Sequence, residues 1–563
     1  AAAQSVYDNP TSQIQINAAV TTLNTAKSTF TATMIKFVPV AGRYYTIKYK
    51  EIDIAFSKSS STSGIQLRTT NPSDVLQRIR FVADNVYPGS YWIYNGNNQA
   101  LSQIYGNSYN MDWETPANGS TWNGYRYYLE TINETDIRIK SVKSGLYLGV
   151  DATTDGTTVY SDKNNTHYWK NYATDYYSSA SSSDLGLNAS SSLTVEAGAT
   201  LTINSATSVN SITVAPGAKL TVTGTNTLTA TSGITLESDA TGTATIVDSY
   251  DSPTISATVK QHVEAGRNWY VSSPVSAAGY SVLSRGNSVV TFNETTKLWE
   301  TITSGNLIPG KGYIQVATAV QGTTGTVDFN GLTNSGNVTV QLTRTGTTQA
   351  GFNLVGNPYP SYLDWSLVAA ANTNVLPTVW FRTKKTTGAG GGYTFTTVNV
   401  ENETPIIVSN DASTTITKHI PPMQAYWVRL NTNPSTNNFT VTNAMRNHLL
   451  DAGNRLKAPK QDELRLIRLK VSNATNSDET VIYFTPNASD IYDRFDSPKM
   501  FNNSASVPEI YTQAGEEKLV INGFTKTEED REVPIGFVTS QANDFTLTVS
   551  EFKNFDASKR ITL

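Results

Sequence analysis

The sequence SLTVEAGATLTINSATSVNSITVAPGAKLTV (residues 192–222) contains one pattern twice, beginning at Ser192 and again at Ser211. In both copies apolar residues alternate with polar ones, as in a strand that buries one face. A looser third copy, GITLESDATGTATIV, begins at Gly233. Strands that repeat with a period of about 20 residues predict a short β-solenoid, in which each copy stacks on the one before it.

The composition of all 563 residues also favours strands over helices. Only 16% of the residues are charged and 10% are aromatic, and Gly alone contributes 37 residues. Thr and aromatic residues suit pleated, half-buried strands, whereas Asn, Gly and Ser suit the turns between them. At roughly 100–200 residues per domain, we expect about three to five domains. The predicted fold class is therefore all-β and multidomain.

Charge and cysteine content exclude several kinds of partner and site. The net charge is −4 with no basic stripe, so no nucleic acid is expected. No stretch approaches about 18 apolar residues, so no membrane span is expected. There is no Cys, which rules out disulfides, thiolate zinc sites and thiol nucleophiles. The composition, rich in Thr, Asn and Ser, favours an extracellular protein.

Residues 11–34 form the best helix candidate, and domain 1–40 is assigned around it. Apolar residues recur there at spacings of three and four, which predicts one apolar stripe. The run QSVYDNPTSQIQINAAVTTLNTAKSTF resembles the last helix of the FIVAR-type three-helix modules of bacterial surface proteins. That resemblance implies that the chain starts partway through a longer protein. The alternative is a plain N-terminal helix that packs on the next domain.

Residues 41–172 contain three weakly similar units, each with a strand, a hairpin and a closing aromatic strand. The first opens RYYTIKY and closes LQRIRFV, the second opens SYWIYNGNNQALS and closes GYRYYLETI, and the third opens DIRIKSVKSGLYLGV and closes NNTHYWKNY. This threefold pattern resembles the ricin-type β-trefoil family, whose units end in a Q-x-W-like motif. Gln77 with Ile79 and His167 with Trp169 match that motif imperfectly.

The resemblance implies sugar binding, but the residue that usually holds the sugar differs. Trefoil lectins use an Asp just after the hairpin leucine of each active unit, and the matching residues here are Ser57, Ser102 and Gly149. The remaining candidate ligand-binding residues are aromatic or lie beside aromatic residues: Trp92, Tyr94, Asp112, Trp113, Trp122, Tyr147, His167 and Trp169. Aromatic rings can stack on a flat ligand, and their alternative role is the domain core.

The rest of the chain divides into a linker and three β regions. Residues 173–192 are rich in Ser and Asn and are interpreted as a linker, followed by the solenoid-like repeats at 193–262. Residues 263–445 hold a duplicated pattern, in which RNWYVSSPVS parallels GFNLVGNPYPS and LIPGKGYIQV parallels HIPPMQAYWVRL. Two related halves that pack into one β-sandwich are predicted there, and a further β-sandwich is predicted at 446–563.

Residues 260–563 also resemble a module of large secreted proteins of the Bacteroidetes. LVGNPYPS and IPPMQAYWV are the most specific matches, and the likeness continues through VPIGFVTSQANDFTLTVSEFKNFD. In those proteins the stretch leads into a C-terminal sorting signal. The resemblance implies export by the type IX secretion machinery to the bacterial cell surface.

A search for catalytic motifs finds none that carries a reaction. The four His lie far apart, and neither H-E-x-x-H nor G-x-S-x-G occurs. Asp112 with Glu114 is the most enzyme-like carboxylate pair, but a polar loop is the favoured interpretation. Asp490, Asp493 and Asp496 are spaced by three and could hold Ca²⁺, with a solvated turn as the alternative. No other cofactor and no catalysis are expected.

These observations leave three hypotheses for function. The first is a non-catalytic, secreted cell-surface adhesin or binding protein that binds a glycan or a host-surface ligand through the trefoil-like domain. The second is the C-terminal accessory region of a larger secreted glycan-degrading enzyme. The third is a purely structural component of a surface fibre.

Overall fold

The computed structural model describes the chain from residue 13 onward, apart from residues 34–36, 59–63, 72–73, 104–110, 117–122, 134, 265–266, 285–287, 317–324, 385–392, 410–415, 450–463, 503–505, 526–530, 543, 557–559 and 563. The regular secondary structure of the described part is nearly all strand, which confirms the all-β prediction. Its helices are α2 (Gln13–Thr33), as expected from the sequence, α3 (Ser281–Ser284) and α4 (Trp365–Ala371). None of the described helices is long and apolar enough to cross a membrane.

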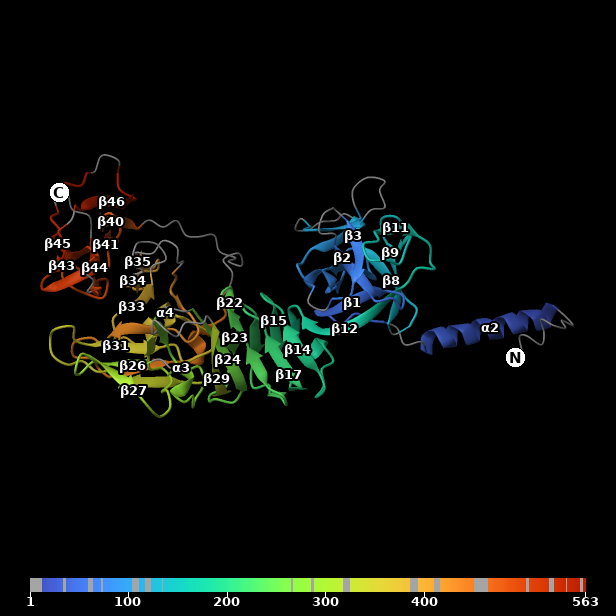
Figure 1. Ribbon diagram of the computed structural model, residues 1–563, viewed down its shortest axis with the longest axis horizontal. Coiled ribbons are helices and arrows are strands. Elements are labelled where there is room, and N and C mark those ends of the chain that lie inside the picture. The colour runs from blue at the N-terminus through green and yellow to red at the C-terminus, as the bar shows by residue number, and fades with distance from the viewer. Residues whose placement is uncertain are drawn as a thin grey trace. The chain divides into compact units, whose positions relative to one another are not determined.

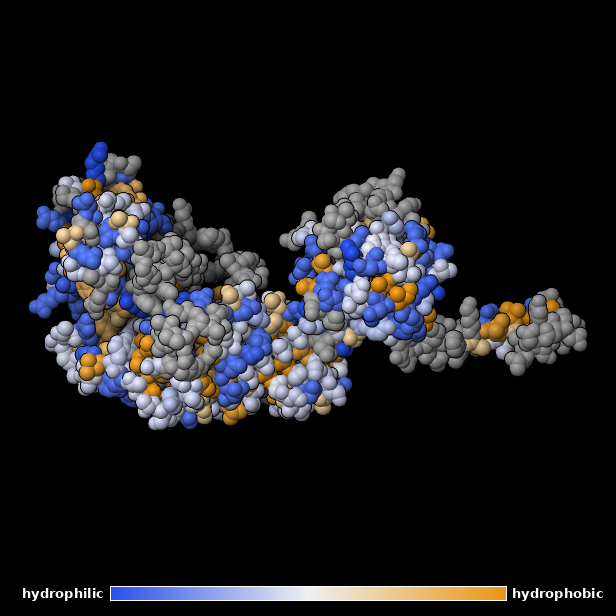
Figure 2. Space-filling view, in the orientation of Figure 1, coloured by the Kyte–Doolittle hydropathy of each residue, from blue (hydrophilic) through white to orange (hydrophobic). Residues whose placement is uncertain are grey.

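The chain forms two compact units, residues 1–186 (the first unit) and residues 187–563 (the second unit). The division between them falls inside the predicted linker 173–192, although the start of that stretch is still part of a strand, β12. Figure 2 shows apolar residues on the visible surface of both units only as small, scattered groups among polar ones.

The first unit is a closed six-stranded barrel with three hairpins. Consecutive barrel strands pair in the order β1–β12–β9–β8–β5–β4, and a bridge from Tyr45 to Ile79 returns the ladder to β1. These strands are β1 (Arg43–Tyr49), β4 (Arg80–Ala83), β5 (Ser90–Tyr94), β8 (Tyr127–Thr131), β9 (Asp136–Ser141) and β12 (Trp169–Tyr177). The hairpins are β2 (Ile54–Lys58) with β3 (Ile65–Thr69), β6 (Ala100–Gln103) with β7 (Met111–Glu114), and β10 (Tyr147–Val150) with β11 (Val159–Lys163).

Equivalent residues of the three units meet in one core. Ile47, Ile93 and Ile139 occupy the same place in β1, β5 and β9, and all three are fully buried. Ile79 and Trp169, which match the closing motif in the sequence, are also fully buried, and so is Tyr127 on the closing strand of the second of these three sequence units. The strand pairing and this threefold core together make the first unit a β-trefoil-like domain.

The second unit begins with the predicted solenoid, which Figure 1 shows as stacked parallel strands. One parallel sheet contains β14 (Ser192–Val195), β17 (Ser211–Val214), β20 (Ile234–Leu236) and β24 (Ser256–Val263). Others contain β15 (Thr200–Ile203), β18 (Lys219–Val222) and β23 (Thr245–Val247), and β16 (Thr207–Val209) with β19 (Leu228–Ala230). Leu193 lies opposite Ile212, which lies opposite Ile234, so identical repeat positions stack in the buried interior.

The two halves of the duplicated pattern form two sheets with the same strand order. The first sheet has the order β25 (Trp269–Val271), β28 (Tyr313–Val316), β26 (Ser288–Asn293) and β27 (Leu298–Ile302). The second has the order β31 (Phe352–Gly356), β37 (Ala425–Arg429), β33 (Thr378–Lys384) and β34 (Tyr393–Asn399), followed by β35 (Ile406–Ser409). Ile314 of the first sheet packs with Phe352, Trp380 and Trp427 of the second. The two related halves therefore share a core as a β-sandwich.

A further sheet closes the chain. Its order is β45 (Ile535–Val538), β43 (Glu509–Ala514), β44 (Glu517–Phe524), β41 (Ser477–Phe484), β40 (Arg465–Ser472) and β46 (Thr546–Lys553), and β42 (Ser497–Pro498) pairs with β44. The remaining strands are β13 (Ala180–Ser181), β21 (Ser238–Asp239), β22 (Gly242–Thr243), β29 (Gly325–Leu332), β30 (Val338–Gln341), β32 (Tyr362–Asp364), β36 (His419–Ile420), β38 (Asn438–Val441) and β39 (Arg446–Asn447).

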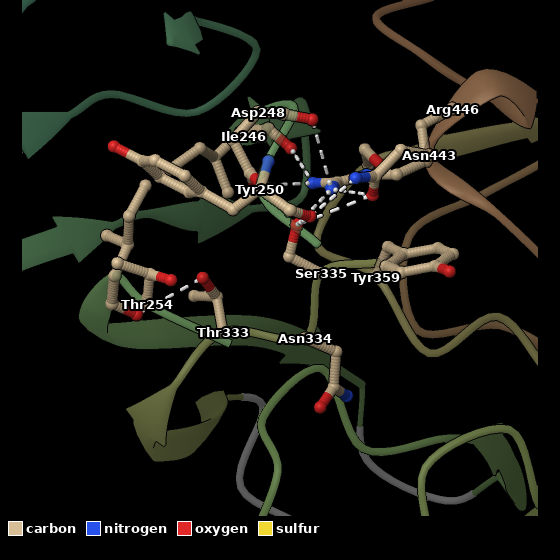
Figure 3. A network of polar contacts seen from close by, with 12 residues as sticks. Ile246, Asp248, Tyr250, Thr254, Thr333, Asn334, Ser335, Tyr359, Asn443 and Arg446 are labelled. Atoms are coloured by element: carbon tan, nitrogen blue, oxygen red, sulfur yellow. Dashed lines mark hydrogen bonds and ion pairs between the residues drawn. The ribbon is translucent and has the colours of Figure 1, made fainter. Parts of the chain in front are cut away.

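A buried ion pair ties the last solenoid coil to the sandwich (Figure 3). Arg446 of β39 reaches Asp248, which directly follows β23, at 3.1 Å between Nη2 and Oδ2, and both side chains are at most 1% exposed. Arg446 Nη2 also donates to the carbonyl of Ile246, and its Nη1 donates to Asn443 Oδ1. The Ser335 hydroxyl donates to the other oxygen of Asp248. Charges this deeply buried are stable only when each polar atom is paired in this way.

His448 adds a second link between the solenoid and the chain that follows the sandwich. Its Nδ1 lies 2.7 Å from the hydroxyl of Thr245, and its Nε2 lies 3.0 Å from the hydroxyl of Thr221. Burial, with Lys219 and Arg446 nearby, lowers the pKa of His448 to about 4. The imidazole is therefore neutral near pH 7 and bridges two solenoid strands, β18 and β23.

Replacing Arg446 with Met should destabilise the second unit by about 3–5 kcal/mol, because Asp248 would stay buried without its partner. Calorimetry of the full chain should show the loss as a lower melting temperature. Lys260→Met is the control, since the Lys260–Glu237 pair is 27% and 30% exposed and should contribute only about 0–1 kcal/mol. Equal effects of the two substitutions would contradict the assigned role of Arg446.

Acid should weaken the fold through His448. The unfolded chain binds a proton at this residue below about pH 6.5, whereas the folded chain does so only near pH 4, so stability should fall as the pH drops through this window. The full contribution is on the order of 3 kcal/mol. Urea unfolding of the wild type and of His448→Gln at pH 7.5 and 4.5 should show a smaller pH effect in the variant. An unchanged pH effect would exclude His448 as its source.

Candidate functional site

The three hairpins of the first unit place one residue each at a corresponding position next to the core. Phe56, Leu101 and Leu148 are the fully buried hairpin residues, and Ser57, Ser102 and Gly149 follow them. The matching inferred from the sequence is thus consistent with the structure. The three positions nevertheless differ in what surrounds them.

Two of the three positions are filled by the protein itself. The Ser57 hydroxyl donates to Asp74 Oδ2 at 2.9 Å. At the third position His167 covers Gly149, so that an added Cβ would lie only 2.4 Å from the ring nitrogen Nδ1. That Nδ1 also lies 2.8 Å from the hydroxyl of Tyr49. Ser57 is therefore hydrogen-bonded within the protein, and the space beside Gly149 is taken by the His167 ring.

The middle position is different. Ser102 is fully buried, and within the described part of the chain its hydroxyl has no hydrogen-bond partner. Ser102 lies opposite Asp112 in the β6–β7 ladder. A buried hydroxyl without a partner loses free energy relative to one that is hydrogen-bonded, so such groups are rare in folded proteins. A ligand or water that reached Ser102 would satisfy it.

A group of stacked aromatic rings stands beside the middle hairpin. The rings of Trp92 and Tyr94 are 6.0 Å apart, those of Trp92 and Tyr125 are 5.1 Å apart, and both pairs are nearly parallel at 13°. The guanidinium of Arg80 lies 4.5 Å from the ring centre of Tyr94. Trp92 and Tyr94 are half-buried, so their edges reach solvent.

A buried ion pair holds the Trp92 side chain in place. Arg126 Nε lies 2.6 Å from Asp84 Oδ2, and these side chains are 1% and 5% exposed. Asp84 also accepts a hydrogen bond from Trp92 Nε1 at 3.2 Å. Burial acts to raise the pKa of Asp84, but hydrogen bonds from Arg126, the Tyr87 backbone and Trp92 outweigh it and hold the pKa at about 2. The carboxylate therefore stays charged and fixes both the indole and the guanidinium.

Glu114 brings a carboxylate to the same place. Tyr94 lies opposite Ala100, and Ala100 lies opposite Glu114, so the three residues form one row across β5, β6 and β7. Tyr125 donates its hydroxyl to Glu114 Oε2 at 3.1 Å. We define Trp92, Tyr94, Ser102, Glu114 and Tyr125 as the middle-hairpin cluster.

The candidate binding residues that were predicted from the sequence lie in different environments in the structure. Trp92, Tyr94 and Asp112 lie in or next to the middle-hairpin cluster. Trp113 and Trp169 are 2% and 0% exposed in the barrel core, so the expectation that they stack on a ligand is wrong for both. Their apolar rings are buried because they alternate inward on β7 and at the start of β12. Trp122 lies outside the described residues.

Two further candidates have internal partners. His167 packs over Gly149 and contacts Tyr49, as described above. Tyr147 donates its hydroxyl to Glu130 Oε2 at 2.8 Å, away from the middle hairpin. Sequence reasoning missed Tyr125, although a signal existed. Tyr125 stands two residues before the closing Tyr127, as His167 stands before Trp169.

The predicted calcium ligands do not come together as a metal site. Asp496 accepts hydrogen bonds from the backbone of Gly523 and of Asp493, each at 2.8 Å. Asp490 pairs with Arg531 at 3.0 Å, and Asp493 accepts from the backbone of Ser489. Among the residues that the structure describes, no group of three or more acidic, His or Cys side chains could hold a metal ion. The three Asp instead shape the turn before β42.

Comparison with protein families gives one match. Residues 178–563 match the family model described as a domain of unknown function (DUF8693), which is more than half of the chain. The barrel of the first unit lies almost wholly before this match. A search of curated proteins found no match to the chain.

Comparison with solved structures gives several partial similarities. A designed threefold symmetric protein is 17% identical over 23% of this chain and 96% of its own, with a TM-score of 0.20. A lectin of Polyporus squamosus bound to a human-type influenza-binding epitope is 11% identical over 24% of this chain and 49% of its own, with a TM-score of 0.20. The cytolethal distending toxin of Haemophilus ducreyi is 12% identical over 26% of this chain and 87% of its own, with a TM-score of 0.20. These values are too low to assign a function.

Gly149→Ala should destabilise the first unit by about 1–3 kcal/mol, because the new methyl group overlaps His167. Thermal unfolding should show this loss, and adding His167→Ala to the same chain should recover part of it. Ser102→Ala is the matched control at the middle hairpin. It removes a hydroxyl that has no partner and should leave stability unchanged or slightly raised. A loss at Ser102→Ala as large as at Gly149→Ala would contradict the difference between the two positions.

Proposed function

We propose that this chain, which belongs to the family described as a domain of unknown function (DUF8693), is a non-catalytic binding protein that binds glycans through the middle-hairpin cluster of its first unit. The observation that carries the proposal is the buried hydroxyl of Ser102, which has no hydrogen-bond partner among the described residues and lies on β6, the strand that pairs with the strand of Trp92 and Tyr94. The other two hairpin positions are filled by Asp74 and His167, so one binding position per chain is expected.

The chemistry of the cluster suits a sugar. A sugar ring presents apolar C–H faces that pack on aromatic rings, together with hydroxyls that need hydrogen-bond partners. Trp92 and Tyr94 supply the ring edges, and Glu114 supplies a carboxylate acceptor in the same row. Few, well-placed polar groups in an aromatic setting are typical of small-ligand sites. The usual trefoil Asp is absent, so the specificity should differ from that of the lectins which use it.

The second unit supports the proposal as a spacer. The solenoid and the sandwich are joined by the buried contacts of Arg446 and His448, which suit a rigid spacer. Single sugar sites of this kind bind weakly, and many copies on one surface raise the overall avidity. The resemblance of the 260–563 region to secreted Bacteroidetes proteins leads us to propose that the chain is exported by the type IX machinery and displayed on a bacterial surface.

A purely structural role is the second candidate. It is favoured by the two filled hairpin positions, since a barrel without open sites serves as a spacer. The alternative of an accessory region beside a glycan-degrading catalytic domain uses the same sugar site and differs only in what the site is attached to.

Binding of the full chain to a broad glycan array should identify at least one ligand, and Glu114→Gln and Tyr94→Ala should each weaken that binding about tenfold or more, which corresponds to about 1.4 kcal/mol. Tyr172→Ala is the control, because Tyr172 is an exposed tyrosine of β12 outside the cluster. Melting temperatures of all variants check that the barrel is intact. An array without signal from folded wild-type protein would favour the structural role.

A further inference from the structure

The C-terminal sheet contains a lysine and an aspartate that are both buried and in contact. Lys499 Nζ forms an ion pair with Asp478 Oδ2, and the two side chains are 4% and 0% exposed. Asp478 lies on β41, and Lys499 directly follows β42. Both residues are held by backbone bonds. The Lys499 amide donates to the Lys518 carbonyl at 2.7 Å, and Asp478 Oδ2 accepts from the Ile510 amide at 2.9 Å.

A second carboxyl group completes the arrangement. Glu509 begins β43, directly before Ile510, and is 5% exposed. Its Oε1 accepts hydrogen bonds from the backbone and side-chain nitrogens of Asn502, at 2.7 and 3.1 Å. Burial raises the pKa of Glu509, while the charge of Lys499 lowers it and that of Asp478 raises it. All three ionisable groups therefore lie within electrostatic reach of one another in a dry site.

The buried contact places the lysine nitrogen and the carboxyl group of Asp478 within reach of each other in a site closed to water. Charged groups lose their hydration when they are buried, and a proton that passes from lysine to aspartate removes both charges at once. The products are a free amine and a neutral carboxylic acid in contact. A desolvated amine is a nucleophile, and two groups that are held together react far faster than the same groups in solution.

We propose that Lys499 and Asp478 join in an intramolecular amide bond, with Glu509 as the proton carrier. Nζ of the neutral lysine attacks Cγ of the protonated Asp478 carboxyl group and forms the new N–C bond. Glu509 takes a proton from the attacking nitrogen and gives one to the departing hydroxyl group. The C–O bond then breaks, and one water molecule leaves. No oxidant, reductant or further reactant is required.

The bond would have a clear structural use. The chain has no Cys and so cannot form a disulfide. An amide between residues 478 and 499 closes a loop that contains nearly all of β41 and all of β42, which removes conformational freedom from the unfolded state. It also anchors β41, the strand between β44 and β40, to the chain that follows β42.

The mass of the intact full chain tests the proposal. Purified wild-type protein should be lighter than its sequence by one water molecule. After tryptic digestion, cleavage at Lys499 should be lost, and peptide 471–494 should appear joined through Asp478 to peptide 495–518. Lys163 is the internal control in the same digest. Its ion pair with Asp151 is open to solvent, with Asp151 71% exposed, so Lys163 should be cleaved normally.

Variants separate the roles of the three residues. Lys499→Ala and Asp478→Ala should each have the full sequence mass, and Glu509→Gln should keep the fold but lose most of the branched peptide. Wild-type protein with the full sequence mass and normal cleavage at Lys499 would overturn the proposal, and this result does not depend on any variant folding. Branched peptide at wild-type levels in Glu509→Gln would overturn the role of Glu509.

Discussion

The buried pair of Arg446 and Asp248 is the contact on which the organisation of the second unit depends. Asp248 directly follows β23 in the last coil of the solenoid, and Arg446 comes from the far end of the sandwich sequence, 198 residues later. Because both charges are withdrawn from water, the pair is favourable only when the two modules meet in one arrangement. Ser335 and Asn443 complete the network, and they come from the loops that flank the second sheet (Figure 3). A buried ion pair of this kind determines how the two modules are arranged more than it contributes to the free energy of folding, which suits the proposed spacer role.

The repeats explain why much of the fold could be predicted from the sequence. In the solenoid, Ser192 pairs with Ser211 in parallel register, so the repeat seen in the sequence is the stacking repeat itself. The duplicated pattern likewise became two sheets of equal strand order, because similar short strands and Pro turns impose similar pairing. Alternation of apolar residues is a local property, and it survives folding. Repeats and alternation do not test the predicted domain boundary at 445/446. Arg446 belongs to the packing of the sandwich on the solenoid because it pairs with Asp248, which is far away in the sequence.

The site was harder to predict, for a physical reason. Trp92, Trp113 and Trp169 look alike in the sequence, and only the barrel decides that two of them face the core. The sequence gives no sign that the Ser102 hydroxyl has no hydrogen-bond partner among the described residues, because that depends on which distant side chains the fold brings to the middle hairpin. The Lys499–Asp478 contact and the nearby Glu509 involve residues on or next to three strands, and no local sequence pattern indicates that they meet. Features that repeat along the chain were therefore predictable. Sites formed by residues that are distant in the sequence and meet only in the fold were not.

Three cation–carboxylate pairs are buried, and the same burial has different chemical consequences for arginine and for lysine. Arg126 with Asp84 and Arg446 with Asp248 are each at most 5% exposed, as are Lys499 and Asp478. A guanidinium does not lose its proton in proteins, so both arginine pairs stay ionic and need several hydrogen bonds to offset their burial. A lysine, unlike an arginine, can give up its proton in a protein, and a neutral amine has a lone pair that can attack a carbonyl carbon. The arginine pairs thus act as polar locks around Trp92 and between modules, whereas the lysine pair is the one whose burial makes a covalent link chemically accessible.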